Sequence, residues 1–276
     1  MIVTGTHVAD RTVAESQSPI DIISPETLQS TGTTELATAL SRALPSLNFP
    51  RPALVDGTSG VRPAQLRGLS PDQVLVLVNG KRYHSSAAIN LNGSIGRGSS
   101  AVDLNSIPVA AIERVEVLRD GASAQYGSDA IAGVVNIVLK GAGSGGSLAV
   151  NYGKYAKGDG EQYQLSGDAG VGFADGRGKL HVAGQVGYQD PTNRSGAYAG
   201  STPNTGNFPS VGQKAFVIGD PDVNAGAVSA NTSFDFSDHL SAYATAVASK
   251  RDIDSYAFYR SKNHNNQSAL LAQFYP

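Results

Sequence analysis

The second half of the chain alternates between apolar and polar residues, and this period of two is the feature that most limits how the chain can fold. In one segment Tyr163, Leu165 and Val171 fall on one face of an extended chain. Gln164 and Asp168 fall on the other face. Because successive side chains of a β-strand point to opposite sides, such a segment predicts a strand with one apolar and one polar face.

We predict five such strands, at about residues 147–155, 161–173, 179–189, 227–236 and 240–252. Strands of about ten residues that alternate in this way, with Tyr or Phe near their ends, are typical of strands that cross an outer membrane at a tilt. The connections also alternate in length, because residues 174–178 and 237–239 are short turns and residues 190–225 form a long stretch. A soluble β-sandwich would show similar alternation, so the strands alone leave both architectures open.

The first half of the chain has an α/β pattern instead. Residues 19–23 predict a strand, and Ser24 begins a short helix. A second helix follows, in which Leu36, Leu40 and Leu44 recur at every fourth position and form one apolar stripe. This half therefore predicts a small domain of short helices and strands.

A buried strand and a long loop come next. Residues 74–78 form a continuous apolar run, and Asn79 and Gly80 supply a tight hairpin turn after it. Residues 83–102 are polar, rich in glycine and too long for a simple connection. Long loops within small domains usually bind something. The stretch lacks the glycine order and the Lys-Ser/Thr ending of a phosphate-binding loop, so we expect no nucleotide site.

The most specific pattern is the glycine-punctuated segment at residues 114–140. It predicts a strand at residues 114–118, a turn at Asp120 and Gly121, one helical turn, and a second strand at residues 133–139. On spacing alone this is a generic sheet corner. The segment strongly resembles the closing part of the plug domain of TonB-dependent outer-membrane receptors.

The resemblance extends upstream of this segment. Arg67 and Gly68 in Gln-Leu-Arg-Gly-Leu, residues 74–80 and residues 103–114 stand in the order and roughly the spacing of the family. The likeness covers about residues 18–140. It implies a fold in which an α+β plug domain, with a small mixed sheet and short helices, precedes antiparallel transmembrane β-barrel strands.

The resemblance also implies a division of the chain. We assign residues 1–17 to an N-terminal segment near the TonB box, 18–140 to the plug domain, 141–146 to a Gly-rich linker and 147–276 to the first five or so barrel strands with their loops. Five strands cannot close a barrel, because plugged transporters use about 22. We therefore expect an incomplete barrel, as in an N-terminal fragment of such a receptor.

Site residues follow from the same resemblance. In the family the outward loops of the plug contact the solute, and here these loops are residues 55–59, 69–73 and 82–97. The candidate solute contacts are Asp56, Ser59, Gln73, Arg82, Tyr83, His84, Ser85, Asn90, Asn92 and Arg97. The plug arginines that pair with barrel carboxylates correspond to Arg67 and Arg119, with Glu116 beside them.

A function is implied as well. The protein would bind a scarce solute, such as a ferric siderophore, a similar chelate or a glycan, and import it by rearranging the plug. Ile2, Val3 and Thr4 would contact the TonB energiser protein by adding an extended segment to one of its sheet edges. The other expected partners are outer-membrane lipid and a small extracellular solute, and the expected location is the outer membrane of a Gram-negative bacterium, with the plug inside the barrel.

Composition excludes several other classes. The chain has no cysteine and a formal net charge of only −2, so we expect neither a disulfide framework nor the clustered cations of a nucleic-acid surface. Its five histidines fall in separate segments without the spacing of metal ligands. We interpret them as solvated, except for His84 beside Arg82 and Tyr83, and we expect no metal, no cofactor and no catalytic residue.

Three rival classes stay open at this stage. A secreted Gly-rich β-structured adhesin would explain the strands and the long loops, but it does not call for a plug-like unit before them. A soluble plug-like binding protein would explain the first half alone. A periplasmic enzyme would need a closed soluble core, whereas residues 147–256 show the alternation of strands with an apolar outer face.

Overall fold

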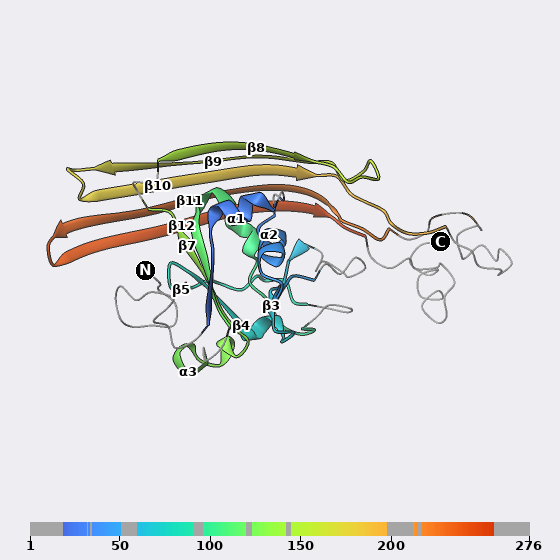
Figure 1. Ribbon diagram of the computed structural model, residues 1–276, viewed down its shortest axis with the longest axis horizontal. Coiled ribbons are helices and arrows are strands. Elements are labelled where there is room, and N and C mark those ends of the chain that lie inside the picture. Colours follow the sequence, from blue (N-terminus) through green and yellow to red (C-terminus); the bar gives the residue numbers. More distant parts are fainter. Residues whose placement is uncertain are drawn as a thin grey trace, which may run out of the picture.

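The molecule consists of two five-stranded sheets, a small mixed one and a long antiparallel one (Figure 1). The computed structural model describes residues 19–31, 33, 35–50, 60–90, 96–119, 123–141, 145–197, 212, 214 and 217–256. The predicted site residues that lie outside the described residues are Ile2, Val3, Thr4, Asp56, Ser59 and Asn92.

The mixed sheet contains the strands of the first half of the chain. Its order is β1 (Ile20–Ile23), β6 (Ile112–Leu118), β7 (Gly133–Leu139), β4 (Val74–Val78) and β5 (Lys81–Arg82). Strands β4 and β7 are parallel, and the other neighbours are antiparallel. Asn79 and Gly80 have φ angles of 49° and 75°, and this predicted two-residue turn lets β5 return beside β4.

Short helices and turns pack against the mixed sheet. They are α1 (Pro25–Ser30), α2 (Leu36–Ala43) and α3 (Ser123–Tyr126), with two short strands, β2 (Leu47–Asn48) and β3 (Gln65–Leu66). The predicted stripe is partly correct, since Leu36 and Leu40 are fully buried, whereas Leu44 is only partly buried at the end of α2. These residues join the apolar core formed with β4, β6 and β7.

Gly133 lets β7 begin close to β6. Its φ angle is 142°, and a Cβ there would lie 2.4 Å from the carbonyl oxygen of Leu118 and 2.5 Å from Cδ2 of Leu66. No side chain larger than hydrogen fits without displacing the backbone. Gly133 is the first residue of the strand that the sequence pattern predicted at residues 133–139.

The long sheet is a simple meander. Its strands are β8 (Gly146–Gly153), β9 (Gln162–Phe173), β10 (Gly178–Gln189), β11 (Asp222–Ser237) and β12 (Leu240–Asp254). The predicted start of the fourth strand at residue 227 is wrong, because pairing already begins with Asp222 opposite Asp254. Ala225 and Gly226 carry too little side chain to show the alternation, but their backbone pairs on both sides.

The two faces of the long sheet differ in burial. Large apolar side chains such as Leu148, Val150 and Val228 are exposed on one face. On the other face Ala183 and His181 are buried against the mixed sheet, which lies along that side in Figure 1.

Both short turns lie at one end of the long sheet, on the left of the figure, and the longer connections lie at the other. No helix in the described part is long and apolar enough to cross a membrane.

Candidate functional site between the two sheets

Polar contacts tie the mixed sheet to the long sheet at the end that carries the short turns. Asn79 Nδ2 donates to Asn231 Oδ1 and to Thr245 Oγ1, each at 3.2 Å. Lys140, directly after β7, places its Nζ 3.0 Å from Asp168 Oδ1 on β9. The carbonyl oxygen of Lys140 accepts from Asn231 Nδ2 at 3.1 Å. The parallel pair β4 and β7 is therefore held at its end by side chains of three strands of the long sheet.

His181 belongs to this group of contacts. Its Nε2 lies 3.0 Å from Asp168 Oδ2, and the side chains of the two residues are 2% and 1% exposed. The interpretation of His181 as a solvated histidine is wrong. His181 lies on the face of β10 that the mixed sheet covers, so its imidazole is buried beside the carboxylate that also holds Lys140.

A second tie lies toward the opposite end of the long sheet. Arg251 on β12 donates from Nη2 to the carbonyl oxygen of Gly60 at 2.6 Å, and the same nitrogen forms an ion pair with Asp103. Burial raises the pKa of the Asp103 carboxyl, although the nearby Arg251 charge opposes this effect. The carboxylate is therefore costly to bury and depends on this guanidinium.

Asp103 continues into a hydrogen-bond network inside the mixed-sheet half. Asp103 Oδ1 accepts from the backbone N–H of Asn105 at 3.0 Å, and Asn105 Oδ1 accepts from the N–H of Ala37 at 3.2 Å. Asn105 thereby caps α2, because the first N–H groups of a helix have no partner within it. Its Nδ2 donates to Glu35 Oε1 at 2.7 Å, and Arg62 Nη1 lies 2.5 Å from Glu35 Oε2.

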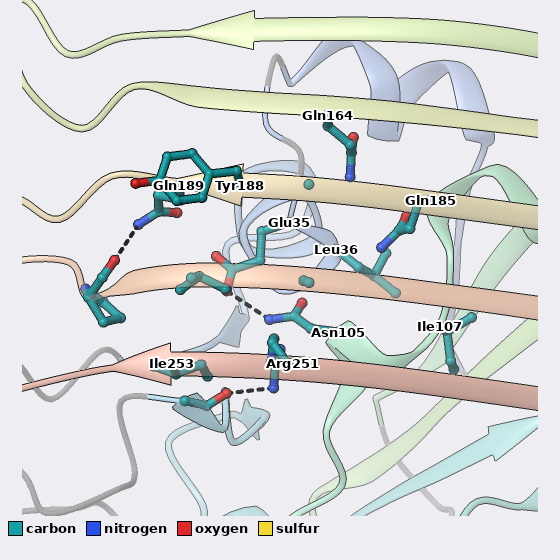
Figure 2. A pocket seen from close by; sticks show the side chains of 15 residues that line it. Glu35, Leu36, Asn105, Ile107, Gln164, Gln185, Tyr188, Gln189, Arg251 and Ile253 are labelled. Carbon is teal, nitrogen blue, oxygen red and sulfur yellow. Dashed lines mark hydrogen bonds between the residues drawn. The ribbon is translucent and has the colours of Figure 1, made fainter.

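A cavity of about 90 Å³ lies beside this network, between the two sheets (Figure 2). Glu35 and Asn105 line it from one side, and Gln164, Gln185 and Arg251 line it from the long sheet. Gln185 also bridges the two parts, since its Oε1 accepts from the N–H of Val109 at 3.0 Å. A space of this size and polarity is large enough for ordered water. The sequence did not reveal the cavity, because its lining residues come from segments far apart in the chain.

The predicted solute contacts are only partly brought together. Asn90 is 1% exposed, its Nδ2 donates to Ser99 Oγ at 3.2 Å, and its Oδ1 has no hydrogen-bond partner among the described residues. Gly96 lies against Ser70 and Pro71, so the predicted loops at residues 69–73 and 82–97 contact one another. Arg97 is exposed beside them, and Gln73 ends the short turn that begins at Pro71.

The residues at the start of the long loop lie elsewhere. The Tyr83 hydroxyl is 3.1 Å from Ser106 Oγ, and its ring is 4.4 Å from that of His84. His84 and Ser85 are exposed.

Arg82 contacts residues outside the predicted outward loops. It forms an ion pair with Asp129 and donates to the carbonyl oxygen of Tyr126 at 2.9 Å. The neighbouring Lys81 has its Nζ 5.8 Å from the ring of Tyr243, near the short turn before β12. Because β5 runs beside β4, Arg82 falls toward the end of the molecule with the short turns (Figure 1).

The predicted ion-pair residues have partners within the mixed-sheet half. Arg67 donates to the carbonyl oxygen of Arg119 at 2.9 Å, and Arg119 Nε lies 2.6 Å from Asp21 Oδ2 on β1. Glu116 is fully buried, with Arg114 Nε 2.9 Å from its Oε1. The ion pairs that do join the two sheets involve Lys140 and Arg251 instead. Sequence reasoning did not find the partner of either cation, because Asp168 and Asp103 lie far from them in the chain.

Comparison with known proteins gives a consistent family. Residues 12–134 match the family model described as TonB-dependent Receptor Plug Domain. The ferric enterobactin receptor of Pseudomonas aeruginosa is 32% identical over 140 residues, which cover 50% of this chain and 19% of that protein. The vitamin B12 transporter BtuB of Vibrio cholerae is 36% identical over 118 residues, or 43% of this chain and 17% of that protein.

Solved structures match over both sheets. The siderophore receptor PirA from Acinetobacter baumannii superposes with a TM-score of 0.66 and 21% identity, covering 95% of this chain and 36% of that chain. The ferric enterobactin receptor of P. aeruginosa in complex with enterobactin gives a TM-score of 0.66 and 23% identity, covering 87% and 34%. The chain thus spans about a fifth of these curated relatives and about a third of these solved chains. Residues 12–134 thus match the plug-domain model, and the chain has the fold of the corresponding part of these solved receptors, with a plug-like mixed sheet and antiparallel strands that match their barrel strands.

Proposed function

We propose that the chain is part of an outer-membrane receptor that binds a scarce solute from outside and admits it to the periplasm when TonB drives a rearrangement of the plug. The observation that carries this proposal is the plug itself, which lies against the inner face of β8–β12 and is held there by polar contacts at two ends. Hydrogen bonds and ion pairs of this kind can break and re-form around water.

The arrangement also supports an orientation in the outer membrane. Leu148, Val150 and Val228 lie on the exposed apolar face, which suits contact with lipid tails. Short turns are typical of the periplasmic side of such barrels, so the end with the longer connections faces outward. The partners in this proposal are outer-membrane lipid, a small extracellular solute and TonB.

The solute class is drawn from the relatives. The names of the similar proteins include ferric enterobactin, siderophores and vitamin B12. For this chain we propose a ferric siderophore or a similar chelate as the solute, with a glycan as the other candidate. Among the described residues of the plug, the candidate solute contacts are Gln73, Arg82, Tyr83, His84, Ser85, Asn90 and Arg97. Asp56, Ser59 and Asn92 are proposed with them.

Two further assignments remain proposals. Ile2, Val3 and Thr4 contact TonB, and Arg67, Glu116 and Arg119 pair with the barrel. Asp21 on β1 already neutralises Arg119, so a barrel carboxylate would have to compete with it. The rival interpretation as an adhesin is not favoured, because the relatives of the plug are receptors.

The test is uptake of labelled solute by cells that carry the complete receptor, with TonB present or deleted. We use ferric enterobactin, cyanocobalamin and a maltooligosaccharide as probes. Import of one probe that stops when TonB is deleted, while surface binding persists, is the expected result. Import that does not depend on TonB, or recovery of the complete protein in the soluble fraction without detergent, would contradict the proposal.

A further inference from the structure

We propose that Arg251 recognises an anionic oxygen of the solute, and that solute and plug share its guanidinium. This inference rests on the proposed function and deepens it. The starting observation is that Arg251 uses only one of its three nitrogens for the plug, since Nη2 makes both the contact with Gly60 and the ion pair with Asp103. Among the described residues, Nε and Nη1 have no hydrogen-bond partner.

The unused donors belong to a residue that lines the cavity. The side chain of Arg251 is 17% exposed, and it borders the space together with Gln185 and Asn105 (Figure 2). A guanidinium stays charged at any physiological pH and carries five N–H donors in a fixed plane. Nη1, whose N–H donors are unused, can donate to an anionic oxygen of a carboxylate, a phosphate or a deprotonated chelating group.

Arg251 also decides the charge preference of the cavity. The amides of Gln164, Gln185 and Asn105 are neutral and accept as readily as they donate. Among the described residues that line the cavity, Glu35 is the one carboxylate, and its charge is neutralised by Arg62, whose side chain is 6% exposed. Arg251 is therefore the one cation among the described residues that line the cavity, and it shares its charge with Asp103.

Sharing one guanidinium couples the solute to the plug. An anion placed on Nη1 withdraws positive charge from Asp103, which is the acid that holds the plug at this end. The contacts of Asn79 and Lys140 at the other end are untouched. By linkage, the factor by which a bound anion weakens the Asp103 contact equals the factor by which that contact weakens anion binding.

The test is titration calorimetry of the complete receptor in detergent, without TonB. Malonate and inorganic phosphate are the anionic probes, and glycerol is the neutral probe. The anion that binds with the lower dissociation constant shows whether the site prefers a carboxylate or a phosphate. Arg251→Gln should weaken anion binding about tenfold or more, because it removes charged hydrogen bonds. Asp103→Asn should strengthen anion binding about fivefold, because it frees the guanidinium. Lys250→Gln is the matched control, since its side chain is 83% exposed and pairs with Asp252.

The opposite signs separate recognition from a merely structural role. If Arg251 only held the plug in place, Arg251→Gln and Asp103→Asn would shift anion affinity in the same direction or leave it unchanged, and either result overturns the inference. Arg251→Lys keeps the charge with fewer fixed donors and should bind with intermediate affinity, which covers the case of a poorly folding Gln variant. The calorimetry is done without TonB, so it is independent of the import assay. If the receptor imports its solute but the variants fail this test, the proposed function stands and only the role of Arg251 is rejected.

Discussion

At the scale of single residues, the plug is built around positions where no other side chain fits. Gly133 is the clearest case, with a φ angle of 142° and two atoms within 2.5 Å of the point that an alanine methyl group would occupy. Gly141 has open space around it and no positive φ angle. The two glycines therefore provide a matched comparison close together in the chain.

We predict that Gly133→Ala destabilises the plug by about 2–4 kcal/mol, because the new methyl group forces β6 and β7 apart and strains the backbone. Gly141→Ala should change stability by less than about 0.5 kcal/mol. Thermal unfolding of the complete receptor, followed by protease digestion of the plug, measures the difference. Equal stability of the two variants would show that β6 can shift at little cost.

The charge on Asp103 predicts a pH dependence at the same scale. Its pKa is raised, chiefly by burial, so the folded plug binds this proton more tightly than the unfolded chain does. Protonation of Asp103 therefore stabilises the folded plug. This stabilisation is fully present below the ordinary Asp pKa of 3.8, and it is lost as the pH rises through the higher pKa of the folded state.

Asp103→Asn should therefore become relatively more stable, compared with the unchanged receptor, as the pH rises from that ordinary value toward neutrality. Denaturation midpoints of the two proteins across this range test the sign. A difference that is constant with pH would mean that burial and the Arg251 charge cancel at Asp103.

At the scale of elements, one side chain links the cap of α2 to the plug–barrel contact. Asn105 accepts from Ala37 and donates to Glu35, while its own N–H binds Asp103. Asn105→Ala should destabilise the plug by about 1–2 kcal/mol, since it removes a helix cap and leaves the buried N–H of Ala37 without its side-chain acceptor. Asn48→Ala on β2 is the control, because that side chain is exposed. Hydrogen exchange at Ala37 and its neighbours should accelerate in the first variant alone.

Neighbouring positions on β8 test the two faces of the barrel strands. Val150 is 76% exposed on the apolar face, and Asn151 next to it donates to Gln164 on the polar face. Val150→Lys should cost about 2–4 kcal/mol of folding free energy in a bilayer, because a charged side chain would face lipid. Asn151→Lys should cost about 1 kcal/mol, the worth of one hydrogen bond. Refolding into lipid vesicles with urea titration compares them, and similar costs would contradict the assignment of the lipid face.

The sequence anticipates elements better than contacts. Strands β4 and β7 have the predicted bounds, because an apolar run between glycine turns leaves few other choices. The start of β11 was missed, since small residues hide the alternation. The cavity and the Arg251 contacts could not be predicted, because Asp103 and Arg251 are 148 residues apart and meet only through the register of β12. The burial of His181 was missed because the segments that cover it come from another part of the chain.

At the scale of the whole molecule, the plug is held to the barrel strands at two places with different character. Near the short turns, Asn79 and Lys140 make several contacts beside the covalent linker to β8. At the other end, the ion pair to the plug comes from Arg251. Gly60 packs there too, since a Cβ on it would lie 2.7 Å from Cδ1 of Ile253 on β12. The chain has no cysteine of its own, so an engineered pair at this point can be interpreted without competing thiols in these 276 residues.

The most direct test of the central claim, that the plug must leave the barrel wall during import, is a reversible crosslink between Gly60→Cys and Ile253→Cys in the complete receptor. Uptake of labelled solute is measured in cells before oxidation, after oxidation and after reduction, with each single Cys variant as a control. The account predicts that the oxidised double variant still binds solute at the surface but no longer imports it, and that reduction restores import. Unchanged import by a fully crosslinked receptor would contradict it, because the plug would then have stayed against β12 throughout transport.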